Sequence, residues 1–175
     1  MAALSVERRV SAWDGVSLVV HDWGIPSHLP ALLCLPGLVR TGGDFADLAA
    51  RHGPARRVVS LDYAGRGGSG RVRDVARYAP EACLRDVSDV CAALHLHRVV
   101  AVGTSMGGLL AMGLAAARPG LLAGVVLNDI GPEIGTGGME AIHHHVADDP
   151  ALPDLAAAAA HLRARLPDLS LDGED

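Results

Sequence analysis

The segment Gly103-Thr104-Ser105-Met106-Gly107 places a serine in the pattern G-x-S-x-G. A serine hydroxyl attacks a carbonyl carbon once a base takes its proton, so the chemistry to consider is nucleophilic acyl transfer. An apolar run precedes the segment and another follows it, which predicts a strand that turns sharply into a helix. Such a turn strains its central residue, and we expect Ser105 to have a positive φ. The alternative is that Ser105 is an ordinary turn residue, because serine and glycine are common in turns.

The segments that must position this serine include several expected strands. Two short β-rich runs, 6–11 and 16–22, are separated by Asp14-Gly15, which predicts an antiparallel hairpin. Continuous apolar runs predict strands that are buried on both faces of a sheet. These runs are 31–35, 57–61, 98–102 and 121–127.

Helices are expected between these strands. Asp44 is expected to cap a short helix that ends near Ala50, and Pro80 fits the first turn of a longer one. Residues 107–117 are apolar on all sides, as in a buried helix. Strands that alternate with helices predict an α/β fold with a mostly parallel sheet covered on both faces.

After Gly131 the alternation of predicted strands and helices ends. A glycine-rich stretch at 135–138 leads into two helical segments rich in alanine and histidine, and no further strand is predicted before Asp175.

Four runs of sequence together resemble one protein family. They are CLPGLVRTGGDFADLA, SLDYAGRGGSG, VVAVGTSMGGLLAMGLAAARP and GVVLNDIGPEI. In order and spacing they resemble bacterial α/β-hydrolases of the serine esterase and carbon–carbon hydrolase type, from about Ser11 to Ile134. The resemblance implies that residues 1–134 are the N-terminal part of a core domain and that 135–175 begin a helical cap (lid) segment. It also implies that the fold is truncated after its sixth strand.

Two positions depart from the pattern of that family. Pro36-Gly37 stands where the family usually has His-Gly, and Ala64 replaces an arginine in the loop after Asp62. Both positions are chiefly structural in the family. Serine at position 105 excludes the members with an aspartate nucleophile, which are the epoxide hydrolases and haloalkane dehalogenases.

The resemblance implies a set of site residues. Ser105 is the expected nucleophile of a nucleophile elbow, and the backbone N–H groups of Leu38 and Met106 are the expected oxyanion hole. The loop at Leu38 could equally be an ordinary tight turn. A histidine would act as base, oriented by an acid, and no metal or organic cofactor is needed. A minority of the family carries the acid where this chain has Asp129, which could also be only a turn residue.

The catalytic base has no convincing candidate. Only His143, His144, His145 and His161 follow Ser105, all in the helical segments after the last expected strand. We therefore expect this chain to be a fragment that is inactive by itself and prone to associate through its last strand. The expected parent enzyme cleaves an ester, a lactone or an activated carbon–carbon bond of a small molecule.

Other functions remain open at this stage. A non-catalytic hydrolase-like interaction module would also lack a histidine. The run Gly65–Gly70 matches G-x-G-x-x-G, so a dinucleotide-binding oxidoreductase is a remote alternative. Against it, Asp62 would lie near a pyrophosphate, and the segment directly after Gly70 (RVRDVARYAP) is predicted to be an interrupted loop and not a long helix. The run His143–His145 does not predict a metal site, because adjacent helical residues point about 100° apart.

Composition narrows the class of protein. The chain has 175 residues and a net charge of −5, without a basic stretch for nucleic acid or an apolar run long enough to span a membrane. No signal peptide is recognised at the N-terminus, which favours the cytoplasm. Three cysteines at irregular spacing predict buried free thiols. The oligomeric state is left open.

Overall fold

A computed structural model describes residues 5–133 and 150–165 of the chain. Backbone contacts divide the chain into two units, Met1–Pro132 and Glu133–Asp175. In the second unit the structure describes helix α5 (Leu155–Arg165), within one of the two segments expected to be helical. The run 143–145 lies outside the described residues. The assignment of 135–175 to a cap segment stays a prediction.

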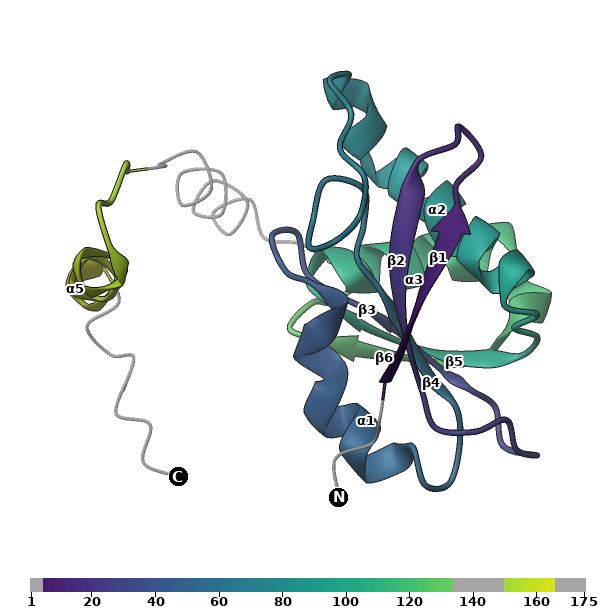
Figure 1. Ribbon diagram of the computed structural model, residues 1–175. Coiled ribbons are helices and arrows are strands. Elements are labelled where there is room, and N and C mark those ends of the chain that lie inside the picture. Colours follow the sequence, from purple (N-terminus) through teal and green to yellow (C-terminus); the bar gives the residue numbers. More distant parts are fainter. Residues whose placement is uncertain (1–4, 134–149, 166–175) are drawn as a thin grey trace. The chain divides into compact units, whose positions relative to one another are not determined.

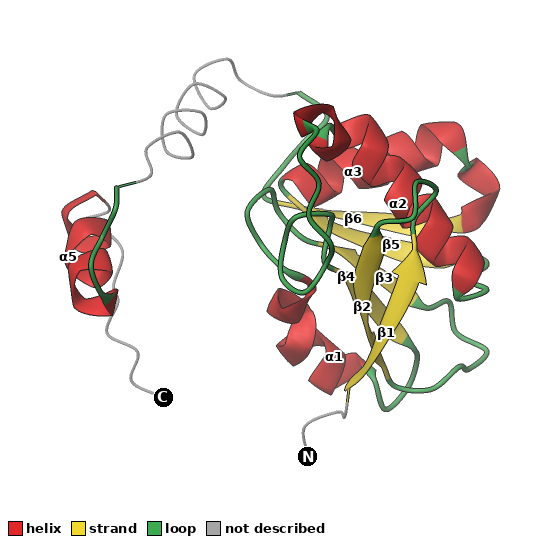
Figure 2. Ribbon diagram, turned by 45° about the horizontal axis from the view of Figure 1, so that its top comes forward, coloured by secondary structure: helices red, strands yellow, loops and turns green. Residues whose placement is uncertain are grey.

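The first unit is built on a six-stranded sheet (Figures 1 and 2). Its strands are β1 (Ser5–Ser11), β2 (Ser17–Trp23), β3 (Leu32–Leu35), β4 (Val58–Leu61), β5 (Val99–Thr104) and β6 (Leu122–Asn128). The strand order is β1-β2-β4-β3-β5-β6. The predicted hairpin is present, since β1 pairs with β2 antiparallel and β2 joins β4 antiparallel. The remaining pairs, β4–β3, β3–β5 and β5–β6, are parallel.

Helices cover both faces of this sheet (Figure 2). Helices α2 (Pro80–Ala93) and α3 (Met106–Ala117) contact each other on one face, and α1 (Ala46–His52) lies on the other. Short 3-10 turns at Gly42–Phe45, Val75–Tyr78 and Pro119–Leu121 complete the elements. Pro80 is the first residue of α2, as expected.

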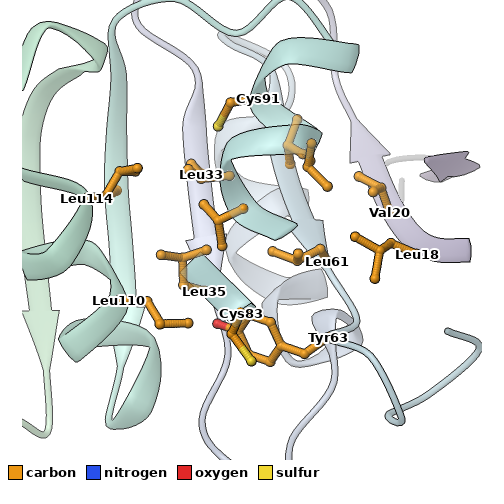
Figure 3. Packing of buried hydrophobic residues seen from close by; sticks show 14 of the residues in the cluster. Leu18, Val20, Leu33, Leu35, Leu61, Tyr63, Cys83, Cys91, Leu110 and Leu114 are labelled. Carbon is orange, nitrogen blue, oxygen red and sulfur yellow. The ribbon is translucent and has the colours of Figure 1, made fainter. Parts of the chain in front are cut away.

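The central strands supply both halves of the core because their side chains alternate between the faces. In β3, Leu33 and Leu35 join the cluster under α2 and α3, which Figure 3 shows, whereas Leu32 and Cys34 join the cluster under α1. All four residues are buried, which confirms the prediction of a doubly covered strand.

The three cysteines are free and buried, as predicted. Burial raises the pKa of Cys34 and of Cys91 to about 12. These thiols therefore stay protonated near neutral pH. No helix in 5–133 or 150–165 combines the length and apolar character needed to cross a membrane.

Two expectations about individual elements are wrong. Asp44 does not cap α1; it lies in the 3-10 turn before that helix and pairs with Arg40 at 2.6 Å. The strand expected at 121–127 is not buried on both faces, because Val125 and Val126 of β6 are 39% and 49% exposed. The reason is its position at the end of the strand order, where β5 is its one partner within the described chain.

Candidate active site

Ser105 lies in the sharp turn between β5 and α3. Its φ is 51° and its ψ is −117°, so the positive φ expected from the sequence is observed. This region of backbone conformation is strained for a residue with a side chain, and such strain is concentrated at functional sites. The Ser105 carbonyl accepts the N–H of Gly108 at 2.8 Å, which starts the helix directly behind the serine.

The two glycines that flank Ser105 allow strand and helix to approach closely. A Cβ atom at Gly103 would overlap the backbone carbonyl of Gly107. A Cβ atom at Gly107 would overlap the carbonyl oxygen of Leu35, at the end of the neighbouring strand β3. The pattern G-x-S-x-G therefore has a packing explanation at both glycine positions.

The end of β6 closes the other side of the turn. The Ser105 N–H donates to the Asn128 carbonyl at 3.1 Å, and the Asn128 side-chain amide donates to the Thr104 hydroxyl at 3.2 Å. Asp129 follows directly, also at positive φ (55°), and is exposed. Its carboxylate is therefore attached to the same edge of the sheet as Ser105, and a role as triad acid stays a prediction.

The loop 36–38 lies next to Ser105. A Cβ atom built at Gly37 would be 3.8 Å from the Ser105 Cβ. The Tyr63 hydroxyl donates to the Pro36 carbonyl at 3.2 Å, and the Arg66 Nε donates to the Leu38 carbonyl. Burial raises the pKa of Tyr63 well above its usual value, so this hydroxyl remains a donor near neutral pH. Two side chains thus fix the carbonyl groups on either side of Gly37.

Tyr63 and Arg66 were not identified from the sequence. Both belong to the loop after β4, in the stretch where Ala64 replaces the usual arginine of the family. The alanine at position 64 was the signal that could have indicated them. Ala64 is fully buried, and Arg66, two residues later, supplies the guanidinium group that contacts the loop 36–38.

The expected oxyanion donors have N–H groups that remain available. Met106 is the first residue of α3, where a helix offers no internal acceptor. The Leu38 N–H makes no hydrogen bond to any residue that the structure describes. The positive end of the α3 dipole adds a favourable field for an anion. The convergence of the two N–H groups on one oxygen stays a prediction.

A histidine partner for Ser105 is not found in the described part of the chain. None of the described histidines makes a hydrogen bond to the Ser105 side chain. His21 instead contacts the Asp62 carboxylate at 3.4 Å, and His161 is in α5, in the second unit. The residues His143, His144 and His145 lie outside the described ranges.

The loop Gly65–Gly70 makes hydrogen bonds within the protein, and this does not favour binding of a dinucleotide. The Asp62 carboxylate accepts the N–H of Gly68 at 2.9 Å, and the Gly65 N–H donates to the Gly70 carbonyl at 2.9 Å. Two of the backbone N–H groups of this loop therefore already donate hydrogen bonds within the protein and are not available to a phosphate. After Gly70 the chain forms a loop and a short 3-10 turn before α2 begins at Pro80, so no helix begins directly after the glycine-rich loop, as the dinucleotide motif requires.

A strand–serine–helix turn on a mostly parallel sheet, beside a backbone loop after β3, is the arrangement of one fold family. The family model described as "alpha/beta hydrolase fold" matches residues 30–168. The chain belongs to the α/β-hydrolase family.

Known proteins agree with this assignment. The chain is 38% identical over 125 residues, 71% of its length, to the 3-hydroxybutyrate-oligomer hydrolase of Cupriavidus necator, of which it covers 43%. It is 30% identical over 127 residues, 73% of its length, to a putative 2-succinyl-6-hydroxy-2,4-cyclohexadiene-1-carboxylate synthase of Bacillus subtilis, of which it covers 46%.

Among solved structures, an α/β-hydrolase from Novosphingobium aromaticivorans superposes with a TM-score of 0.88 at 37% identity. The match covers 96% of this chain and 60% of that one. The chain thus spans less than half the length of the curated relatives described above.

Proposed function

We propose that the protein is a serine hydrolase that cleaves an ester of a small molecule, with a lactone or an activated carbon–carbon bond as related substrates. The observation that carries the proposal is Ser105 at positive φ between β5 and α3, next to the loop 36–38. A relative named as a hydrolase of 3-hydroxybutyrate oligomers supports the choice of an ester.

The proposed chemistry uses few groups of this chain. The Ser105 hydroxyl attacks the carbonyl carbon and loses its proton to a histidine base. The carbonyl oxygen becomes negatively charged and is held by the N–H groups of Leu38 and Met106. The proton then passes to the leaving alcohol, and water hydrolyses the acyl-serine. We assign no residue of this chain as the base, and we expect residues 1–175 alone to be inactive.

The test is covalent labelling of the protein encoded by the intact gene with a fluorophosphonate probe. An activated serine reacts with this probe and an ordinary hydroxyl does not, so wild type is expected to be labelled and Ser105→Ala is not. Ser88→Ala is the matched control, because that hydroxyl only donates to the Leu84 carbonyl in α2. Esterase activity should fall at least about a thousandfold in Ser105→Ala.

Labelling that persists in Ser105→Ala would remove the serine from the mechanism. A folded wild-type protein that is neither labelled nor active would favour the non-catalytic interaction module. Residues 1–175 expressed alone form a second sample, for which no labelling is expected.

A further inference from the structure

A hollow of about 480 Å³ lies beside the proposed oxyanion loop. Its walls are Val39 and Thr41, which come after the loop 36–38, the turn 64–67, Arg71 and Tyr78. Two arginines, Arg66 and Arg71, contribute to it, and none of the described residues that line it is acidic. We call this feature the basic hollow. It contrasts with the net charge of −5 of the chain.

The basic hollow is connected to the candidate site through the backbone. Val39 directly follows Leu38, whose N–H is the proposed oxyanion donor and whose carbonyl accepts the Arg66 Nε. Gly37, one residue earlier, lies beside Ser105. The hollow therefore begins at the residue after the proposed oxyanion donor, two residues after the glycine beside Ser105.

The Arg66 guanidinium is held rigidly at the wall of the hollow. Its Nη1 donates to the Ala64 carbonyl at 3.2 Å and its Nε to Leu38, while its carbon atom Cζ lies 5.8 Å from the centre of the Tyr63 ring. Its Nη2 has no hydrogen-bond partner within the described residues. A fixed guanidinium with a remaining donor loses little entropy when it binds an anion.

Arg71 is anchored through its two neighbours. The Gly70 N–H donates to the Ser17 carbonyl at 2.8 Å. On the other side, the Tyr78 hydroxyl accepts the Val72 N–H at 2.8 Å and donates to the Val72 carbonyl at 2.7 Å. The backbone of Arg71 is therefore fixed, although its side chain is exposed.

The segment that carries Arg71 is also held in place at Arg77. Arg77, which precedes Tyr78, is buried and donates to Asp86 at 2.9 and 2.6 Å. It also reaches Asp14 at 2.6 Å in the turn of the β1–β2 hairpin.

Arg71 differs from Arg40 and Arg77 in having no acidic partner among the described residues. Arg40, in the adjacent loop, is neutralised by Asp44 at 2.6 Å. Arg71 makes neither an ion pair nor a side-chain hydrogen bond with any part of the chain that is described. Its positive charge is therefore available to an anion from solution.

We propose that the basic hollow binds a carboxylate of the substrate, and that the preferred substrate is an ester whose acyl part ends in a free carboxylate. This inference rests on the proposed function, because the reacting carbonyl is placed at Ser105. A carboxylate matches the planar donor geometry of two guanidinium groups, whereas a neutral chain end would leave both charges without a partner.

The first test measures hydrolysis by the protein encoded by the intact gene. The substrates are p-nitrophenyl hemiglutarate and p-nitrophenyl pentanoate, which have the same chain length and differ in the terminal carboxylate. Wild type should prefer the hemiglutarate, and Arg71→Gln should lower its kcat/KM about tenfold without changing that of the pentanoate. Arg73→Gln, at an exposed position outside the lining of the hollow, is the matched control and should change neither.

The second test measures binding without chemistry. Ser105→Ala is titrated calorimetrically with monomethyl glutarate and with methyl pentanoate. The glutarate should bind more tightly, with an affinity that decreases as salt is added and that is weakened when Arg71→Gln is combined with Ser105→Ala.

The outcomes separate the two proposals. If wild type hydrolyses both esters equally and Arg71→Gln has no selective effect, the carboxylate inference is wrong and the hydrolase proposal stands. If wild type hydrolyses neither ester, calorimetry decides whether the hollow binds a carboxylate, and the hydrolase proposal fails only if fluorophosphonate labelling of Ser105 is absent as well. Equal binding of the two methyl esters would overturn the inference.

Discussion

Gly107 shows how a single residue can control both stability and the geometry of the candidate site. A Cβ atom at this position would overlap the Leu35 carbonyl oxygen and approach the Pro36 carbonyl oxygen at 2.8 Å. These two oxygen atoms belong to the backbone at the end of β3 and at the start of the loop 36–38, which cannot move without separating β3 from α3. The glycine is thus required by packing rather than by its own φ.

Gly107→Ala is therefore expected to lower the free energy of unfolding by about 3 kcal/mol, the upper end for overpacking, and to reduce serine labelling. Urea unfolding followed by circular dichroism measures the first effect. Gly113→Ala, in the same helix, is the control. Its Cβ would meet only the flexible end of Leu84 at 3.3 Å, so its stability should stay within about 1 kcal/mol of wild type. Equal effects of the two substitutions would contradict this account.

At the scale of elements, a buried carboxylate connects three strands. Asp22 of β2 accepts the Arg8 Nε from β1 at 2.6 Å. It also accepts two hydrogen bonds from Arg57, beside the start of β4, at 2.9 and 2.8 Å. Burial raises the pKa of Asp22, but the hydrogen bonds from Arg57 and Arg8 outweigh it, and the pKa is lowered from 3.8.

Asp22→Asn is expected to reduce the free energy of unfolding at pH 7 by roughly 2 to 4 kcal/mol, because it leaves the half-buried Arg57 without its charged partner. Since the folded pKa is lowered, the stability contributed by Asp22 is present above its ordinary pKa of 3.8 and is lost as the pH falls through the folded value. As the pH falls from about 5 to about 2, the free energy of unfolding should therefore decrease less in the variant than in wild type.

Asp44→Asn is the matched control for that experiment. Its partner Arg40 is exposed, so this (i, i+4) pair should contribute no more than about 0.5 kcal/mol. Urea titrations at several pH values compare the three proteins. If the two substitutions have the same cost, burial of the Asp22 cluster is not what makes it stabilising.

The strands and turns were predicted correctly where residues adjacent in sequence determine the local structure. The hairpin at Asp14-Gly15, the apolar β3 and the turn at Ser105 each depend on residues that are adjacent in sequence. Asp44 was misassigned because a free carboxylate can either cap a helix or pair with a cation, and Arg40 is four residues away. Local propensity does not decide between these partners.

The candidate site was predictable only in its backbone. Ser105 and the loop at Leu38 follow from strand ends and glycines. Tyr63 and Arg66 instead act on that loop through contacts that are 27 and 28 residues apart in sequence. Side-chain contacts of this kind depend on how the strands are ordered in the sheet. The order β4-β3-β5 brings the loops after these strands together, and no pattern within a single segment specifies it.

At the scale of the whole molecule, the two edges of the described sheet differ in character. The edge strand β1 carries Glu7, Arg8 and Arg9, and charged side chains discourage pairing with another chain. The opposite edge strand, β6, contains LAGVVLN and has no charged residue. Val125 and Val126 are 39% and 49% exposed there, so β6 combines exposed apolar side chains with unpaired backbone groups.

The 175-residue chain is therefore expected to self-associate through β6 at roughly 100 µM, and Val126→Lys should shift it toward monomer. Light scattering coupled to gel filtration measures the mass, and circular dichroism checks that the variant folds. Val6→Lys is the matched control, because Val6 is 52% exposed on β1, where charges already oppose pairing. It should leave the association unchanged. If both variants or neither become monomeric, the surface that associates is not the β6 edge, and its exposed valines have no role in assembly.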